Sequence, residues 1–214
     1  MDRSQVGIVI PALNEADTIT DVVKSSKNYG VPIVVDDGST DATANLAKQS
    51  GAVVVSHFEN VGYDRALNSG FFKAAEIGCE IVITVDADGQ HNPLLIQRFI
   101  DTIDARADVV IGIRSHKQRL TEHIFAMYTR LCFGIQDPLC GIKGYRISIF
   151  KALGHFDSYG SVGTELLLYA VRRGYIIHQL PFPVRARQGK SRFGSIINAN
   201  IKIFRAMVLG FCWR

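Results

Sequence analysis

The sequence is poor in the features that mark several large protein classes. Its four cysteines, Cys79, Cys132, Cys140 and Cys212, show no metal-ligand or redox spacing. No stretch reaches the roughly 18 uninterrupted apolar residues that cross a bilayer, and the N-terminus has no cationic and apolar leader. These absences indicate a reducing, cytosolic setting and a chain that does not span a membrane alone.

Strong net charge and low-complexity tracts are also missing. The formal charge is +4 over 214 residues, which by itself does not indicate a nucleic-acid partner, and we expect none. Hydrophobic residues make up 47% of the chain, enough to fill one substantial core. We predict one domain over residues 1–194, followed over residues 195–214 by an amphipathic or apolar helix that contacts a membrane surface or a partner.

Short β-branched runs alternate with amphipathic segments in the first half of the chain. Since strands that alternate with helices imply right-handed crossovers, the pattern predicts an α/β fold with a mainly parallel sheet flanked by helices. The second half predicts helices at about residues 121–132 and 164–173, a strand near 175–180 and a final helix from about 195. The predicted strands of the first half are Val6–Ile10, Ile33–Val35, Val53–Val55, Ile81–Val85 and Val109–Ile113.

Three loops that follow predicted strands are unusually polar. They cover Pro11–Glu15, Asp36–Asp41 and Asp86–His91. Because ligands of open α/β sheets bind beyond the carboxyl ends of the strands, we expect the three loops to converge on one crevice. The six histidines show no ligand spacing, and we expect them at the surface or behind the site residues.

Two carboxylates separated by one residue, Asp86 and Asp88, come directly after a buried strand. Carboxylate oxygens suit Mg²⁺ or Mn²⁺, which could hold two phosphate oxygens and stabilise a departing diphosphate. An ordinary turn with capping aspartates is the alternative. In the second loop, Asp37 is a candidate to accept hydrogen bonds from a nucleoside, while Ser39 or Thr40 is expected to cap the next helix.

Four motifs carry a family resemblance: PALNEADTI, VVDDGSTDAT, NVGYDRALNSG and VDADGQH. In this order and spacing they resemble the family 2 glycosyltransferases over about residues 5–115. The resemblance implies the nucleotide-diphospho-sugar transferase fold known as GT-A. The segments at 137–146, 164–166 and 187–194 resemble dolichol-phosphate mannosyltransferases and their bacterial polyprenyl-phosphate relatives.

The resemblance also implies a set of site residues. Asp88 and Glu165 would be catalytic, and the metal would be held by Asp86, Asp88 and Gln90. Phosphate groups or the acceptor would be bound by Arg114, Arg187, Ser191 and Arg192. The nucleotide-sugar would be bound by Pro11, Ala12, Asn14, Glu15, Val35, Asp37, Gly38, Asp86, Ala87 and Asp88.

The expected activity is the metal-dependent, inverting transfer of a hexose, mannose or glucose, from a nucleotide-diphospho-sugar to a polyprenyl phosphate. A lipid phosphate is already ionised at neutral pH and can attack without a general base. A saccharide hydroxyl is the alternative acceptor, and Glu165 would then serve as the base. The other reading of Glu165 is a charge that stabilises a helix N-terminus.

Three further questions stay open at the level of sequence. A nucleotidyltransferase also joins carboxylates, metal and phosphates, but would release pyrophosphate, and a non-catalytic nucleotide-binding module is a third class. The final helix fits an interfacial helix at the cytosolic membrane face, which would make the protein peripheral, or equally a helix packed on the core. Whether a separate membrane subunit is also needed is the third question.

Overall fold

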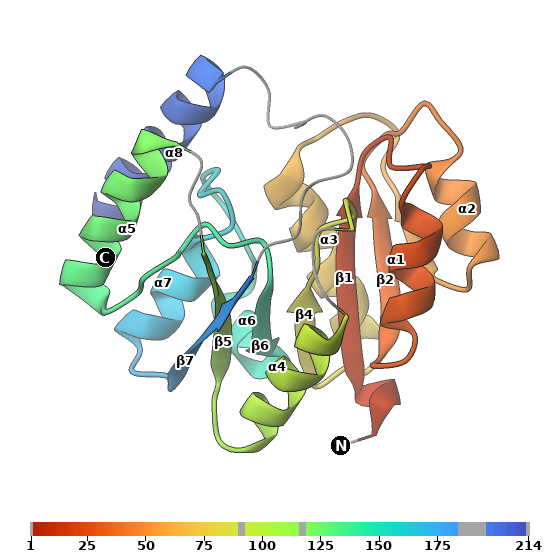
Figure 1. Ribbon diagram of the computed structural model, residues 1–214, viewed down its shortest axis with the longest axis horizontal. Coiled ribbons are helices and arrows are strands. Elements are labelled where there is room, and N and C mark those ends of the chain that lie inside the picture. Colours follow the sequence, from red (N-terminus) through yellow and green to blue (C-terminus); the bar gives the residue numbers. More distant parts are fainter. Residues whose placement is uncertain (1, 90–92, 116–118, 184–195, 213–214) are drawn as a thin grey trace.

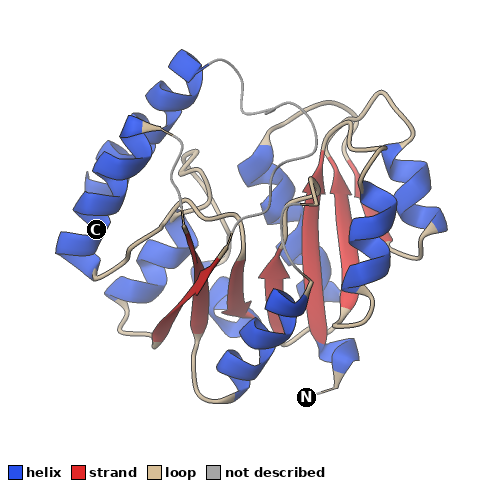
Figure 2. Ribbon diagram, viewed as in Figure 1, coloured by secondary structure: helices blue, strands red, loops and turns tan. Residues whose placement is uncertain are grey.

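The computed structural model describes residues 2–89, 93–115, 119–183 and 196–212, and its strands form one sheet with helices on both faces (Figures 1 and 2). Across the described residues the sheet has seven strands, in the order β3-β2-β1-β4-β6-β5-β7. The strands are β1 (Val6–Ala12), β2 (Val31–Asp36), β3 (Val53–Ser56), β4 (Ile81–Thr84), β5 (Val109–Arg114), β6 (Lys143–Arg146) and β7 (Ile177–Phe182). The predicted α/β fold with a mainly parallel sheet is therefore confirmed.

Most strands and helices lie where the sequence pattern predicts them. The five strands predicted in the first half correspond to β1–β5, and the helices predicted near 121–132, 164–173 and 195 onward correspond to α5, α7 and α8. The strand predicted near 175–180 is β7, which begins two residues later. The helices are η1 (Arg3–Gln5), α1 (Ile19–Ser26), α2 (Thr43–Gln49), α3 (Tyr63–Glu76), α4 (Leu94–Asp104), α5 (Leu120–Phe133), α6 (Ile147–Leu153), α7 (Glu165–Arg172) and α8 (Ile196–Cys212).

The sequence pattern did not predict β6, which runs antiparallel between β4 and β5. Its residues include a lysine, a glycine and an arginine, so it lacks the apolar β-branched run that marks the other strands. Its burial comes from its neighbours: Lys143 is 4% exposed and Tyr145 is fully buried. Tertiary packing thus overrides a weak local preference here.

Two apolar layers cover the two faces of the sheet. Successive strand residues point to opposite faces, so Ile8 and Ile10 pack in one layer with α1 and α4, while Val9 packs in the other with α3 and α7. A smaller third cluster joins α5 to α8 through Phe125, Ile203 and Ala206. Figure 1 shows α8 lying along α5 at one side of the molecule. Across the part of the chain that the structure describes, none of the helices combines the length and apolarity of a membrane span.

Candidate active site

The three polar loops meet at the carboxyl ends of the parallel strands, as predicted. The hydroxyl of Thr18 donates to the carbonyl oxygen of Ala87 at 2.7 Å, which joins the loop after β1 to the loop after β4. The backbone amide of Asn14 donates to the Ser39 hydroxyl at 2.8 Å, which joins the loop after β1 to the loop after β2. One edge of the sheet therefore carries the candidate nucleotide-binding residues.

Asn14 holds two of these loops together with its side chain as well as its backbone. It adopts a left-handed φ of 51°, and its Oδ1 accepts from the Thr40 amide at 2.8 Å. Ser39 and Thr40 are thus used in the loop contact, and the prediction that one of them caps α2 is wrong. The helix begins three residues later, where the Asp41 carboxylate accepts from the Thr43 amide at 2.9 Å.

Asp37 is buried and fixes the segment that leads into α3. Its Oδ1 accepts from the Val61 amide at 3.0 Å and from His57 Nδ1 at 2.7 Å, and its Oδ2 accepts from the Gly62 amide at 2.8 Å. Next to it, Gly38 has a φ of 76°, and a Cβ there would lie 2.5 Å from the Glu59 carbonyl carbon. Both residues therefore bring the segment at 57–62 against the end of β2.

Asp36, which the sequence pattern did not single out beside Asp37, has a carboxylate oxygen that the described protein does not satisfy. It is 5% exposed, and its Oδ1 has no hydrogen-bond partner within the described parts of the chain. A buried carboxylate oxygen without a donor carries a free-energy cost, which a bound ligand with an N–H or O–H group would relieve. Its position as the last residue of β2 is the signal that could have identified it.

The remaining predicted nucleotide contacts lie at the same edge. Pro11 and Ala12 end β1 and pair in register with Val35 and Asp36 of β2, and the side chains of Ala12 and Val35 are buried. In the adjoining loop, the Glu15 amide donates to the Thr43 hydroxyl at 2.8 Å. The structure thus brings these residues together at one edge of the sheet.

The first of the two carboxylates after β4 lies next to a segment from the second half of the chain, which the sequence pattern did not predict. A Cβ at Gly141 would lie 2.1 Å from Asp86 Oδ2, so the backbone just before β6 packs directly against that carboxylate. The Thr84 hydroxyl donates to the Gly141 carbonyl at 2.6 Å and accepts from the Lys143 amide at 3.0 Å. Asp88 is 6% exposed. The segment that leads into the antiparallel strand therefore brings a residue of the second half against Asp86.

Of the predicted metal ligands, the structure describes Asp86 and Asp88. Gln90 lies outside the described residues, as do Arg187, Ser191 and Arg192. Within the described ranges, no group of three or more histidine, cysteine, aspartate or glutamate side chains could hold a metal ion. A cation bound by Asp86 and Asp88 would need its other oxygen ligands from a substrate, from water or from residues not described.

Arg114, at the end of β5, makes a bidentate pair with Asp137. Its Nε and Nη2 donate to the two Asp137 oxygens at 2.8 and 2.9 Å, and Nη2 also donates to Glu122 at 3.2 Å. Burial lowers the pKa of Arg114, but hydrogen bonding and the charge of Asp137 outweigh it, so the pKa is raised. The Arg114 guanidinium, predicted to bind phosphate, thus uses most of its donors in internal ion pairs.

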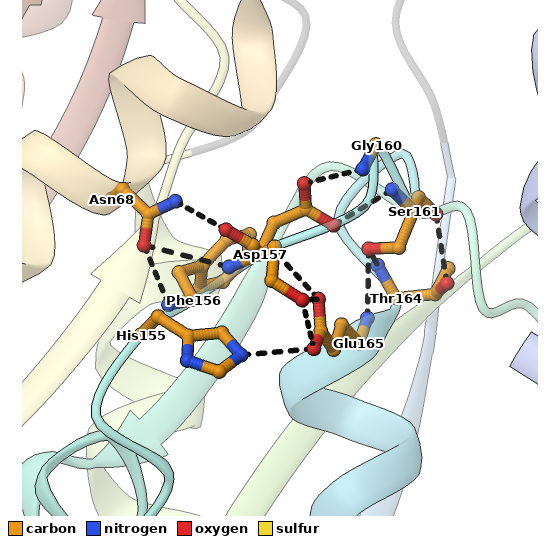
Figure 3. Close-up of polar contacts among 9 residues, drawn as sticks. Asn68, His155, Phe156, Asp157, Gly160, Ser161, Thr164 and Glu165 are labelled. Carbon is orange, nitrogen blue, oxygen red and sulfur yellow. Dashed lines mark hydrogen bonds and ion pairs between the residues drawn. The ribbon is translucent and has the colours of Figure 1, made fainter. Parts of the chain in front are cut away.

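Glu165, the first residue of α7, is fully buried within the loop at 155–164 (Figure 3). Its Oε1 accepts from His155 Nε2 at 2.9 Å, and its Oε2 accepts from the Ser158 amide at 2.6 Å. The Ser158 hydroxyl donates to Oε1 at 2.8 Å. Neither oxygen faces open solvent, so the carboxylate organises this loop, which agrees with the helix N-terminal reading.

A buried lysine, Lys143, and a partly buried aspartate, Asp64, also hold this loop. Lys143 donates from Nζ to the Gly163 carbonyl at 2.6 Å, while Asp64 accepts from the Gly163 and Val162 amides at 2.6 and 3.2 Å. Burial lowers the pKa of Lys143 to about 8. Burial, followed by the charge of Asp157, raises the pKa of Asp64 to about 6. Neither residue was singled out from the sequence.

Comparison with known proteins decides the class. Residues 7–161 match the family model described as Glycosyl transferase family 2. The chain belongs to this family. It is therefore a glycosyltransferase, which rules against the nucleotidyltransferase and the non-catalytic module.

Two curated relatives cover most of the chain. The polyprenol monophosphomannose synthase of Mycolicibacterium smegmatis is 27% identical, over 85% of this chain and 77% of its own. The UDP-N-acetylglucosamine–dolichyl-phosphate N-acetylglucosaminyltransferase of Methanococcus voltae is also 27% identical, over 94% of each chain. Both names agree with the resemblance to polyprenyl-phosphate glycosyltransferases.

A solved structure is similar in fold. The glucosyl-3-phosphoglycerate synthase of Mycobacterium tuberculosis, in complex with Mn²⁺, UDP and phosphoglyceric acid, superposes with a TM-score of 0.78 at 22% identity. The match covers 96% of this chain and 78% of that chain. The predicted GT-A fold is thereby confirmed.

Proposed function

We propose that this glycosyltransferase transfers a hexose, mannose or glucose, from a nucleotide-diphospho-sugar to a polyprenyl phosphate, with inversion at the anomeric carbon. It would act as a peripheral protein at the cytosolic face of a membrane. The observation that carries the proposal is an exposed apolar surface on α5 and α8, because a water-soluble acceptor would not require it.

This surface, the apolar strip, consists of seven side chains that are each between 41% and 80% exposed. On each helix they recur every three or four residues and therefore lie on one face. The Thr121 hydroxyl donates to Asn200 Oδ1 at 2.7 Å, which ties the two helices side by side. The members are Leu120, Ile124, Met127 and Leu131 on α5, and Ile201, Phe204 and Val208 on α8.

The chemistry of the surroundings favours a lipid bilayer as the occupant of the apolar strip. Large apolar side chains gathered on two adjacent helices are uncommon on a protein surface that faces only water. Cationic side chains flank them, with Arg130 on α5 and Lys202 and Arg205 on α8. Apolar residues beside basic ones are typical of helices that lie in the interface of anionic membranes.

The relatives support the same acceptor class. The two curated relatives carry polyprenol or dolichyl phosphate in their names but differ in the sugar that those names give. The lipid phosphate is the common element, so it is the better supported part of the proposal. The choice of mannose or glucose rests on the sequence resemblance.

A divalent metal fits the edge of the sheet where the nucleotide-sugar is proposed to bind. Mg²⁺ or Mn²⁺ is commonly bound by one or two carboxylates together with substrate phosphates and water, and Asp86 and Asp88 offer that donor set. The glucosyl-3-phosphoglycerate synthase of similar fold was solved in complex with Mn²⁺ and UDP. When bound, the metal would neutralise negative charge on the departing nucleoside diphosphate. Asp36 would accept a hydrogen bond from the nucleoside, which would satisfy its buried Oδ1.

The acceptor chemistry explains why no exposed general base is needed. An ionised lipid phosphate oxygen attacks the anomeric carbon from the face opposite the leaving diphosphate, which inverts the configuration. A saccharide hydroxyl would need a base, and the Glu165 carboxylate is fully buried and hydrogen-bonded on both oxygens. We therefore place Glu165 in the structure of the loop. Contacts from Gln90, Arg187, Ser191 and Arg192 remain proposals from the resemblance.

The test is a transfer assay with purified protein, polyprenyl phosphate in detergent, Mg²⁺ or Mn²⁺, and labelled GDP- and UDP-sugars. We expect a lipid-linked sugar from at least one donor and none from Asp88→Ala. Nucleotide binding without any lipid product, in detergent or in liposomes, would contradict the proposed acceptor and favour a hydroxyl.

Replacement of Glu165 separates the two acceptors. Glu165→Gln should keep measurable transfer to the lipid phosphate, with a loss no larger than that of Ser158→Ala. The second variant removes a hydroxyl contact to the same carboxylate without touching a candidate base, so it is the matched control. A dead Glu165→Gln beside an active Ser158→Ala, both with folded circular dichroism spectra, would favour a hydroxyl acceptor.

A further inference from the structure

A pocket of about 410 Å³ lies between the start of α3, the loop at 157–162 and α8. Its wall contains three cations, Arg65 from α3 and Lys202 and Arg205 from α8. None of the three makes an ion pair with another residue that the structure describes. The three cations therefore have no direct carboxylate partner among the described residues.

Two carboxylates also line the pocket, and both accept hydrogen bonds from backbone amides. Asp64 accepts from the amides of residues 162 and 163, as described above. Asp157 accepts from the Gly160 and Ser161 amides at 2.8 and 2.7 Å (Figure 3). Their oxygens accept from the backbone of the loop at 155–164, and neither carboxylate forms an ion pair with Lys202 or Arg205 among the described residues.

The position of these cations on α8 links the pocket to the apolar strip. Ile203 and Ala206 are buried against α5, while Ile201, Phe204 and Val208 are exposed. On a helix of 3.6 residues per turn, Arg205 and Lys202 fall between these two faces. A molecule with an apolar chain along the exposed face would present its head group at the cationic flank.

The pocket is also close to the proposed metal carboxylates. Tyr63 lines it, and burial and then the charges of Asp86 and Asp64 raise the pKa of this tyrosine. A Cβ at Gly163 would lie 3.5 Å from the Tyr63 ring, and Lys143, two residues after the Gly141 that packs against Asp86, donates to the Gly163 carbonyl. An anion bound in the pocket would lie beside the place where sugar transfer is proposed to occur.

We infer that Lys202 and Arg205 form a binding site for the phosphate monoester of the acceptor, on the helix that also contacts the membrane. This inference rests on the proposed function for its lipid source. The same chemistry would bind a water-soluble phosphate monoester, so the two sources have to be separated by experiment. Paired cations are well suited to a phosphate, since charge-assisted hydrogen bonds are stronger than neutral ones.

The experiment uses the full chain and the variants Lys202→Gln, Arg205→Gln and their combination. Arg130→Gln is the matched control, because Arg130 is an exposed cation that flanks the apolar strip on α5 but does not line the pocket. For each protein, the KM for polyprenyl phosphate, the KM for the donor and binding to anionic vesicles without polyprenyl phosphate are measured. Binding of citronellyl phosphate, a short soluble prenyl phosphate, and of 3-phosphoglycerate is measured by calorimetry without donor.

We expect each single variant to raise the KM for polyprenyl phosphate about tenfold, as for the loss of a charge-assisted hydrogen bond. The donor KM and vesicle binding should change no more than in Arg130→Gln. Arg205→Lys should recover most of the loss. Tighter binding of citronellyl phosphate than of 3-phosphoglycerate would identify the lipid source, and the reverse order would identify a soluble one.

Two outcomes would overturn the inference. In the first, the combined variant keeps a KM for the acceptor within twofold of the unmodified protein. In the second, calorimetry shows equal phosphate binding by the combined variant and the unmodified protein, or none by either. Calorimetry needs no turnover, so it still decides on the pocket if no sugar is transferred and the proposed function fails.

Discussion

The edge formed by the loops after β1, β2 and β4 differs from the loop before α7 in how its polar groups are used. At the edge, neutral side chains such as Asn14 and Ser39 join the loops after β1 and β2, and the Asp37 carboxylate accepts from the segment at 57–62. Before α7, buried charges such as Glu165 and Lys143 make the contacts that hold the loop. The edge keeps the carboxylates of Asp36 and Asp86 at the proposed ligand-binding position, whereas the loop uses its charges to hold its own backbone in place.

The largest expected effect lies at the edge. Asp88→Ala should lower transfer by about 1000-fold if its carboxylate holds the metal, the upper range for loss of one group that stabilises a leaving anion. Thermal stability should change little, which calorimetric unfolding would check. Asp21→Ala, at an exposed carboxylate of α1, is the control. Equal activities of the two variants would refute the metal role.

Outside both regions, loss of one charge from the Arg114–Asp137 pair should affect folding. Asp137→Asn leaves Arg114 without its bidentate partner and should lower the free energy of unfolding by about 3 kcal/mol, as for other broken buried pairs. Urea unfolding would measure it. Glu76→Gln breaks an exposed pair with Lys73 and should cost no more than about 0.5 kcal/mol. Similar losses in both variants would show that burial does not distinguish these pairs.

Gly141 packs against Asp86 at the edge and lies two residues before Lys143, which donates to the loop before α7, so a change there should affect the edge. Gly141→Ala places a methyl group against the Asp86 carboxylate and should raise the Mg²⁺ or Mn²⁺ concentration for half-maximal transfer about tenfold. Leu139→Ala, two residues earlier, trims a partly buried side chain without approaching Asp86, and metal dependence should stay unchanged. An unaltered metal titration for Gly141→Ala would mean that Asp86 is not restrained by this contact.

The smallest expected effect is a pH dependence of stability. The pKa of Asp64 is raised from 3.8 to about 6, so the folded state binds the extra proton between these values. The stabilisation is complete below about pH 4 and is lost as pH rises through about 6. Asp64→Asn should remove this slope, on the order of 1 kcal/mol for a partly exposed group, in urea unfolding from pH 4 to 7. A slope retained by the variant would assign it to another group.

The same comparison explains what the sequence could predict. Strands β1–β5 and the polar loops after three of them are contiguous patterns, so periodicity and topology place Asp86 and Asp88 at one edge. The contacts of Lys143 with Gly163 and of Asp64 with Gly163 join residues 20 and 99 positions apart. No local pattern encodes such pairs. The antiparallel β6 was missed for a related reason, since only its neighbours make Lys143-Gly144-Tyr145-Arg146 a buried strand.

The pairing of α5 with α8 has a consequence for how the enzyme would search for its acceptor. A single interfacial helix leaves a protein free to roll about the helix axis, but two helices joined by Phe125, Ile203 and Ala206 define a plane. A protein resting on that plane would diffuse in two dimensions with one fixed tilt. Encounters with the proposed lipid acceptor would then depend on its density per area of membrane and not on its bulk concentration.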